Sequence, residues 1–240
     1  MSDWDFEGSA VRGPFRGVYT EDLVQTLDAW TGNLGGPDPR NRARREGIRV
    51  LKNPVLEAVL SKAHPISPII WAGPIMVWGI TRGVQQHGGV NTAGLVLLGI
   101  LLWTLLEYFL HRVVFHLKPS GPSGKMYSFM IHGYHHEFPN DKMRLVAPPY
   151  LLLPVGFGIA LLFMVLFGNA WLPVLAGTGI GYVAYDWTHY YTHHFHPKKG
   201  LGAWLRRYHL KHHFQEGDMR YGISSPLWDL AFGSYLSPDK

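Results

Sequence analysis

The sequence contains no cysteine, so the chain can form neither disulfide bonds nor thiolate metal sites. Charged residues are also scarce, at 16% of the chain, and two long stretches lack them altogether. No Asp, Glu, Lys or Arg occurs at positions 83–106 or at positions 145–185. A helix needs about 20 apolar residues to cross a bilayer. These runs are atypical of a soluble protein and predict membrane-spanning helices.

The positions of the apolar runs predict an all-α integral membrane protein with four transmembrane helices. The long uncharged run divides at Gly168-Asn169, with Pro173 just beyond, which indicates a tight helical hairpin. The expected spans cover residues 66–81, 90–110, 149–167 and 170–185.

The remaining residues divide into a polar arm and the entry to the first span. Residues 1–53 form a predicted cytosolic arm, with one short helix near Glu21 to Trp30, and residues 54–240 form the membrane domain. Apolar residues recur at helical spacing from Pro54 to Lys62. This spacing suggests an interfacial helix, and a helix packed in a core would fit as well.

Basic residues predict the orientation of the chain in the membrane. With four spans, all but one of the 22 Lys and Arg residues fall on a single side, the exception being Arg82. That side is expected to be cytosolic and to carry both termini. The net charge of +5 therefore fits a membrane surface, since the basic residues flank apolar segments and form no stripe typical of nucleic-acid binding. The membrane itself is either the endoplasmic reticulum or a bacterial inner membrane.

Histidines are concentrated on the predicted cytosolic side. Of 14 histidines, twelve lie between His111 and His213, and none is in a predicted span. Positions i, i+3 and i+4 share one face of a helix, which is the ligand spacing found here. The predicted metal ligands are His111, His116, His132, His135, His136, His189, His193, His209, His212 and His213. Ten imidazoles are too many for one metal ion and suit two, with about five each.

Three details of this site follow from spacing. His111 and His116 lie five apart, about 140° around an α-helix, so from a straight helix they cannot easily bind the same ion, though they could approach two neighbouring ions. Glu107 and Asp186 each lie one helical turn from a ligand and could accept its second N–H, or could simply be helix-end charges. They are favoured over Asp141, Asp218 and Asp229 in this role. The roles of His194 and His196 stay open.

Ligand type alone does not select the metal, because imidazole binds zinc, copper, iron and nickel. Zinc hydrolases usually need only three protein ligands, and zinc has no redox chemistry. A pair of iron ions could activate dioxygen against an unactivated C–H bond. The predicted cofactors are therefore two iron ions with O2 as co-substrate, although isolated protein could carry zinc in the same site.

Longer motifs around the histidines resemble one family. They are HGYHHEFPNDKMRLVAPP at 132–149, YDWTHYYTHH at 185–194, and YHLKHHF at 208–214 followed by YGISSPLWDLAFG at 221–233. They are similar to the fatty acid hydroxylase superfamily of membrane di-metal enzymes, and to its fatty acid 2-hydroxylase branch in particular. The resemblance covers about residues 50–236.

This resemblance implies four spans beneath a cytosolic cap that holds the metals, and hydroxylation of a long acyl chain at C2 with O2 and two electrons. The ten histidines named above match the ligands of the family. Some members carry a fused cytochrome b5 domain with a heme-binding HPGG motif, and the stretch before His64 is too short for such a domain. Electrons are therefore expected from a separate donor, such as cytochrome b5, a reductase or a ferredoxin.

Several alternatives stay open at this point. Lys142 and Arg144 could bind a substrate head group or serve as ordinary membrane anchors. The same site could support lipid desaturation or sterol oxidation. A metal-transporting or metal-sensing membrane protein is a further class, although transporters usually place ionisable groups inside their spans. The substrate could be a free fatty acid, an acyl thioester or a ceramide-like lipid.

Overall fold

The computed structural model describes residues 17–32, 34–35 and 47–239, and this part of the chain is helical apart from its loops. Its one β contact is an isolated antiparallel bridge between Tyr19 and Leu51. The all-α prediction is therefore confirmed for the described residues. Most of the predicted arm, residues 1–16 and 36–46, lies outside them.

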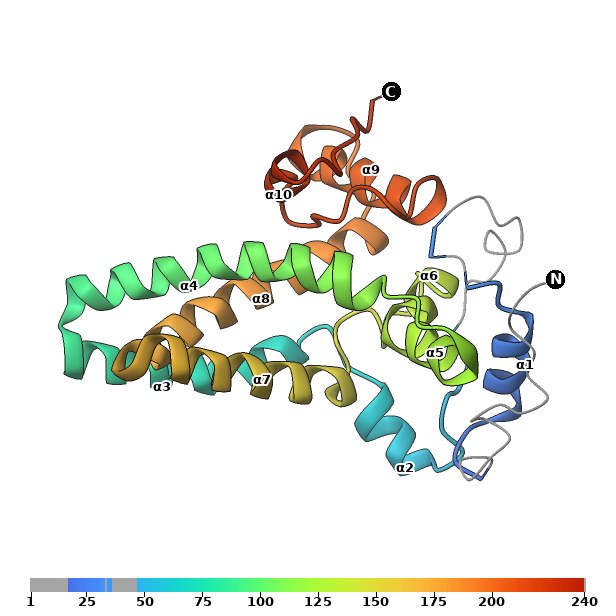
Figure 1. Ribbon diagram of the computed structural model, residues 1–240, viewed down its shortest axis with the longest axis horizontal. Coiled ribbons are helices and arrows are strands. Elements are labelled where there is room, and N and C mark those ends of the chain that lie inside the picture. The colour runs from blue at the N-terminus through green and yellow to red at the C-terminus, as the bar shows by residue number, and fades with distance from the viewer. Residues whose placement is uncertain (1–16, 33, 36–46, 240) are drawn as a thin grey trace.

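Four long helices run side by side and form the elongated half of the molecule (Figure 1). They are α3 (Ser67–His87), α4 (Gly89–Phe109), α7 (Pro149–Phe167) and α8 (Trp171–His194). Gly88, at φ 77°, makes the turn between α3 and α4. Gly168, at φ 50°, begins the short 3₁₀ turn η6 (Gly168–Ala170) between α7 and α8, where the sequence placed the hairpin. Glycine is favoured at both turns because a positive φ costs it no steric clash.

Helices α4 and α8 approach each other closely through glycine. A Cβ atom on Gly99 would lie 2.0 Å from the carbonyl oxygen of Val174, and one on Gly177 would lie 2.0 Å from that of Val96. The Thr178 hydroxyl donates to the Gly99 carbonyl at 3.1 Å. Small residues allow this kind of backbone contact between membrane helices. The contact holds α8 beside α4 and so fixes where both helices enter the histidine-rich region.

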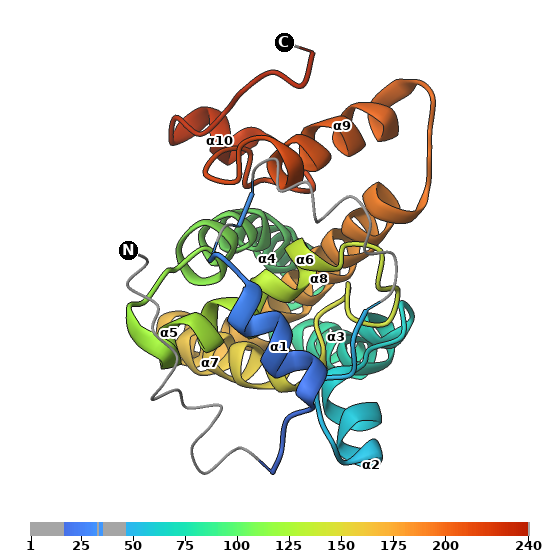
Figure 2. The same cartoon turned by 90° about the vertical axis from the view of Figure 1, so that its right-hand side faces the viewer.

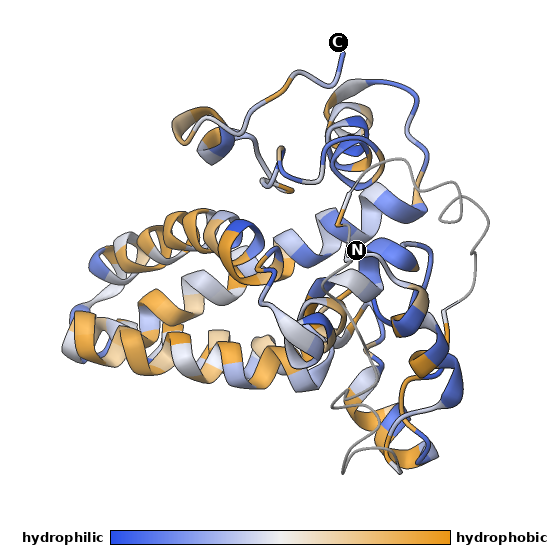
Figure 3. Ribbon diagram, turned by 45° about the vertical axis from the view of Figure 1, so that its right-hand side comes forward, coloured by the Kyte–Doolittle hydropathy of each residue, from blue (hydrophilic) through white to orange (hydrophobic). Residues whose placement is uncertain are grey.

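Two helical segments are long and apolar enough to cross a membrane, Gly89–Phe115 and Pro149–His194. The second contains both α7 and α8. Only 22% and 11% of the most apolar stretch of each segment is buried within the protein, so neither is the core helix of a soluble protein. Hydrophobic colouring predominates on the long helices, whereas the short helices at the other end carry a mixture of hydrophobic and hydrophilic residues (Figure 3). This exposed apolar surface indicates membrane association.

Short helices gather at one end of the four long ones (Figure 2). We call this region the cap. It contains α1 (Glu21–Ala29), α2 (Pro54–Leu56), α5 (Gly121–Ser128), α6 (Tyr134–Glu137), α9 (Gly200–Phe214) and α10 (Leu227–Ala231). Three π-helical segments complete it: η3 (Glu57–Ser61), η4 (Leu110–Phe115) and η5 (Phe129–Gly133).

Helix α1, which the sequence predicted, is held against the cap by apolar packing. The Thr20 side chain accepts from the Leu23 N–H and caps its first turn. Leu23, Leu27 and Trp30 are buried and belong to one cluster with Phe129. The described part of the arm is thus attached to the helices that carry histidines.

The predicted helix at Pro54 to Lys62 is formed by α2 and η3, and it is amphipathic. Val55 is 66% and Val59 59% exposed on its outer side. Glu57, on the inner side, forms an ion pair with Arg144, and both side chains are buried. The apolar outer side of this helix suits an interfacial position, whereas the ion pair on its inner side holds it to the rest of the cap.

Candidate metal centre

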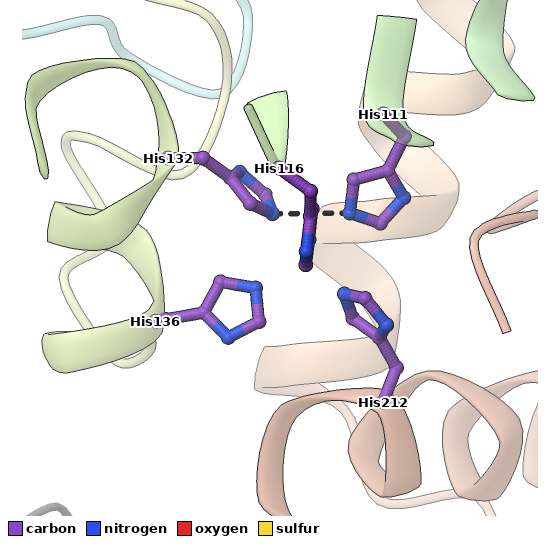
Figure 4. Close-up of side chains that lie close together, drawn as sticks. All are labelled: His111, His116, His132, His136 and His212. Atoms are coloured by element: carbon purple, nitrogen blue, oxygen red, sulfur yellow. Dashed lines mark hydrogen bonds between the residues drawn. The ribbon is translucent and has the colours of Figure 1, made fainter. Parts of the chain in front are cut away.

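The ten predicted ligand histidines come together in two groups of five. Each residue offers one ring nitrogen, and within a group these nitrogens all lie within 4.8 Å of one another. The first histidine group is His111, His116, His132, His136 and His212. The second histidine group is His135, His189, His193, His209 and His213. All ten are buried, and the rings of the first group point toward a common centre (Figure 4).

Helix geometry explains how the two groups divide the motifs. Histidines four residues apart join the same group, as His132 and His136 do, and as His209 and His213 do. His135, three residues after His132, joins the second group, and His212, three residues after His209, joins the first. The motifs on α6 and α9 therefore each supply both groups. The sequence predicted that the histidines of each motif share one helical face, and this prediction did not distinguish the two groups.

The prediction that His111 and His116 cannot easily bind the same ion was wrong, because they belong to one group. The segment that joins them, η4, is a π-helix, and the His116 N–H donates to the His111 carbonyl at 3.1 Å. A π-helix bonds residue i to residue i+5, so residues five apart stack on one face. The wide angular separation expected from the sequence applies only to a regular α-helix.

Contacts between ring nitrogens test whether the groups suit a metal. His135 Nε2 lies 2.9 Å from His189 Nε2 and 3.0 Å from His213 Nε2. Two nitrogens bound at right angles to one ion, each about 2.1 Å away, would be about 3 Å apart. Neither ring nitrogen of His116 or His136 has a hydrogen-bond partner among the described residues, although all four atoms are buried. Buried nitrogens that face one another without partners fit a shared cation.

Backbone carbonyls orient two of the imidazoles. His111 Nδ1 donates to the Tyr221 carbonyl at 2.6 Å, and His212 Nδ1 donates to the Met219 carbonyl at 2.7 Å. A proton on Nδ1 leaves the Nε2 lone pair free to bind a metal, which is the usual second-shell arrangement. Both carbonyls belong to the segment between α9 and α10.

Burial keeps the grouped histidines of the cap neutral. Burial, with a smaller contribution from nearby imidazoles, lowers the pKa of His135 to about 3. The pKa values of His132, His209 and His213 are also well below 6.5, with burial as the main cause. Neutral imidazole is the form that binds metal, so no proton has to leave these rings at neutral pH.

Glu107, one of the two predicted carboxylate partners, has another role. Glu107 accepts hydrogen bonds from the backbone N–H groups of Ile223 and Ser224, at 2.7 and 2.8 Å, so its assignment to His111 was wrong. Asp186 Oδ2 has no hydrogen-bond partner within the described part of the chain, which gives no support to its assignment to His189.

Asp229 binds the same loop. Its carboxylate accepts from the N–H groups of Tyr221 and Gly222, at 2.8 and 2.7 Å. The two acidic residues therefore hold loop 221–224, whose Tyr221 carbonyl in turn orients His111. Sequence spacing could not reveal this, since Glu107 and the loop are far apart in the chain.

A cavity of about 520 Å³ reaches the histidines from the long helices. His132, His135 and His189 form part of its wall. Most of the remaining wall is apolar, with Trp71 and Ile75 from α3 and Leu151 and Phe157 from α7 among its residues. Its size is within the usual range for small-molecule sites.

Arg144 also lines this cavity. Its guanidinium donates to Asp141 at 2.6 Å and to Glu57, and its side chain is only 8% exposed. Two carboxylates thus already neutralise the charge of Arg144, so little positive charge is left to attract an acidic head group. Lys142 is not among the lining residues.

Two groups of buried imidazoles beside long apolar helices, with an apolar cavity leading to them, define a membrane-associated, histidine-rich protein suited to metal binding. A sequence profile of the fatty acid hydroxylase family matches residues 96–234, more than half of the chain. The chain belongs to this family.

Individual relatives agree with this assignment. The chain is 36% identical over 222 residues to "Dihydroceramide fatty acyl 2-hydroxylase FAH1" of Arabidopsis thaliana, covering 90% of this chain and 93% of that protein. It is 42% identical to the human "Fatty acid 2-hydroxylase", covering 80% of this chain and 58% of the human one. Among solved structures, "Full length scs7p (only hydroxylase domain visible)" matches with a TM-score of 0.74 and 27% identity, covering 93% and 92% of the two chains.

Proposed function

We propose that this protein is a membrane di-iron oxygenase that hydroxylates a long acyl chain at C2, with O2 as co-substrate and electrons from a separate donor. The observation that carries the proposal is the pair of five-imidazole groups, three members of which line an apolar cavity. The names of the relatives supply the reaction, because they are hydroxylases of fatty acyl chains.

All ten grouped histidines are proposed as metal ligands. The donor set is entirely imidazole nitrogen, and each group supplies five donors from at least three separate helical segments. When bound, two iron ions would supply the redox chemistry needed to attack an unactivated C–H bond, which zinc lacks. The protein positions the substrate and the metals and excludes water.

The cavity is the proposed acyl-chain site. Its apolar walls suit the methylene groups, since both the lining and the chain are apolar. His132, His135 and His189 bring the site of chemistry into the same wall. A chain whose head group is held near the cap would present its first carbons to this part of the wall. The reacting position is thus set by where the head group stops.

For the topology, we propose four spans formed by α3, α4, α7 and α8, with the cap and both termini in the cytosol. The support is the one-sided distribution of Lys and Arg and the placement of the cap at a single end of the helices. A span needs about 20 residues. Helix α3, of 21 residues, is long enough even though it is less apolar than the others.

The test is expression in a host that makes no 2-hydroxy lipids, followed by lipid mass spectrometry under ¹⁸O₂. We expect 2-hydroxy acyl chains that carry one ¹⁸O atom and disappear without oxygen. His135→Ala should abolish them and reduce the bound metal. His196→Ala is the matched control, because His196 is exposed and belongs to neither group. Full metal loading with no oxygen-dependent product in any lipid class would refute the proposal.

A further inference from the structure

The C-terminal part of the cap presents an apolar surface. From 221 to 238 the only charged residue is Asp229, and its side chain is fully buried. On the outer side of α10, Leu227 is 52% and Leu230 59% exposed, and Phe232 just beyond is 44% exposed. A loop region of a soluble cap would be expected to carry charge on such a surface.

Contacts with α4 fix the depth of α10 along the long helices. Trp228 Nε1 donates to Thr104 Oγ1 at 3.0 Å, and the Phe232 ring stacks on Tyr108 with 5.3 Å between centroids. Thr104 lies seven residues before His111, so at 1.5 Å per residue α10 sits about 10 Å closer to the middle of α4 than His111 does. Figure 1 shows α10 lying over the body of α4.

This depth falls within the thickness of a bilayer. Thr104 lies about 22 Å along the helix from Gly89, where α4 starts, at a rise of about 1.5 Å per residue. The hydrocarbon core of a bilayer is about 30 Å thick. If α4 spans the membrane from near Gly89, α10 therefore lies on the cytosolic side of the membrane at the edge of the hydrocarbon core.

The exposed face of α10 continues onto an exposed face of α4. Leu101 and Leu97 precede Thr104 by three and seven residues, which places all three on one side of the helix. Leu101 is 62% and Leu97 61% exposed. Leucines of α10 and α4 thus form one apolar surface.

We propose that α10 is a membrane-contacting element whose outer leucines, Leu227 and Leu230, lie among the lipid acyl chains next to the head groups. The proposal rests on α4 crossing the membrane, as in the proposed function. Depth, absence of exposed charge and continuity with α4 all favour lipid as the occupant. Because α10 also carries Asp229, the contact of α10 with the bilayer stabilises the loop that orients His111.

The absence of native cysteine allows a direct test. Single cysteines at Leu227, Leu230, Leu101 and Gln215 would be spin-labelled in the full-length chain and reconstituted into vesicles of phosphatidylcholine and phosphatidylglycerol. Collision rates with O2, which enters lipid, and with a water-soluble nickel chelate would then be compared. All four positions are exposed, and each labelled protein is checked for its metal content.

We expect a several-fold higher ratio of O2 to nickel collisions at Leu227, Leu230 and Leu101 than at Gln215, which lies at the end of α9. A lipid-like ratio at Leu101 with a water-like ratio at both α10 positions would overturn this inference alone. A water-like ratio at Leu101 would overturn the span of α4, and with it the proposed topology. Low collision rates with both reagents at Leu227 and Leu230 would indicate that protein covers these positions, and would overturn the proposal that α10 contacts lipid.

Discussion

Asp229 offers the sharpest test of how the metal centre is built. Its carboxylate is fully buried and accepts three hydrogen bonds, from the N–H groups of Tyr221 and Gly222 and from the Ser234 hydroxyl at 2.7 Å. Asp229→Asn keeps the size of the side chain but turns one acceptor oxygen into a donor. Whichever way the amide is placed, at least one buried backbone N–H loses its partner.

The expected loss can be worked from these contacts. A hydrogen bond to a charged group contributes about 1.5–3 kcal/mol, so the variant should lose about 2–3 kcal/mol of stability. Loop 221–224 should also loosen, and with it the Tyr221 carbonyl that orients His111. Removing an outer partner of a metal ligand typically costs about 10–100-fold in metal affinity. The first histidine group should therefore release its metal more readily than the second.

The assay is a competitive chelator titration of purified protein, with metal content measured at each step. Wild type should keep two metals at a chelator concentration that leaves the variant with one. Asp218→Asn is the control, because the Asp218 side chain is 79% exposed and pairs with an exposed Lys118. If Asp229→Asn kept both metals at wild-type affinity and melted at the wild-type temperature, the role assigned to the loop would be wrong.

Three further predictions concern stability. Glu57→Gln should lower it by about 3 kcal/mol in thermal or denaturant unfolding, because Arg144 would remain buried without that charge partner, whereas the exposed Glu21→Gln should have little effect. Burial raises the pKa of Glu57, but its hydrogen bonds and Arg144 lower the pKa overall. The stabilisation by the Glu57–Arg144 pair should therefore be present above about pH 4.3 and be lost as the pH falls below that value, as measured by urea unfolding. Gly99→Ala should cost about 1–3 kcal/mol by forcing α4 from α8, while Gly94→Ala, with open space around its Cβ, should not lower the melting temperature. The metal-free protein should melt at progressively lower temperature as the pH falls below about 6.5, because its buried histidines stay neutral while those of the unfolded chain take up protons. An unchanged melting temperature down to pH 5 would contradict the lowered pKa values of these histidines.

The sequence predicted the long helices and the ten converging histidines because both depend on local patterns. A charge-free run and a helical spacing can be read from neighbouring residues alone. The hairpin at Gly168 was also local, since a glycine there ends one helix before another begins. The predicted span of residues 170–185 ends where the charge-free run ends, whereas helix α8 continues to His194.

Features that depend on unusual helices or on distant contacts were not predictable in this way. The π-helical turn of η4 is one such feature, because nothing in its six residues signals an extra residue per turn. Glu107 lies one turn before His111, which suggested a direct contact. The loop at 223–224 competes for that carboxylate, and only the folded chain brings it there.

The division of adjacent histidines between groups has a mechanical consequence. His135 and His136 are neighbours on α6, and His212 and His213 are neighbours on α9, yet each pair is split between the two groups. Adjacent residues on a helix point about 100° apart, so α6 and α9 each face both centres. Helix α8 contributes only to the second group, and η4, which continues α4, only to the first. Because α4 and α8 are locked together through Gly99 and Gly177, the spacing of the two centres is set by helix packing well outside the cap.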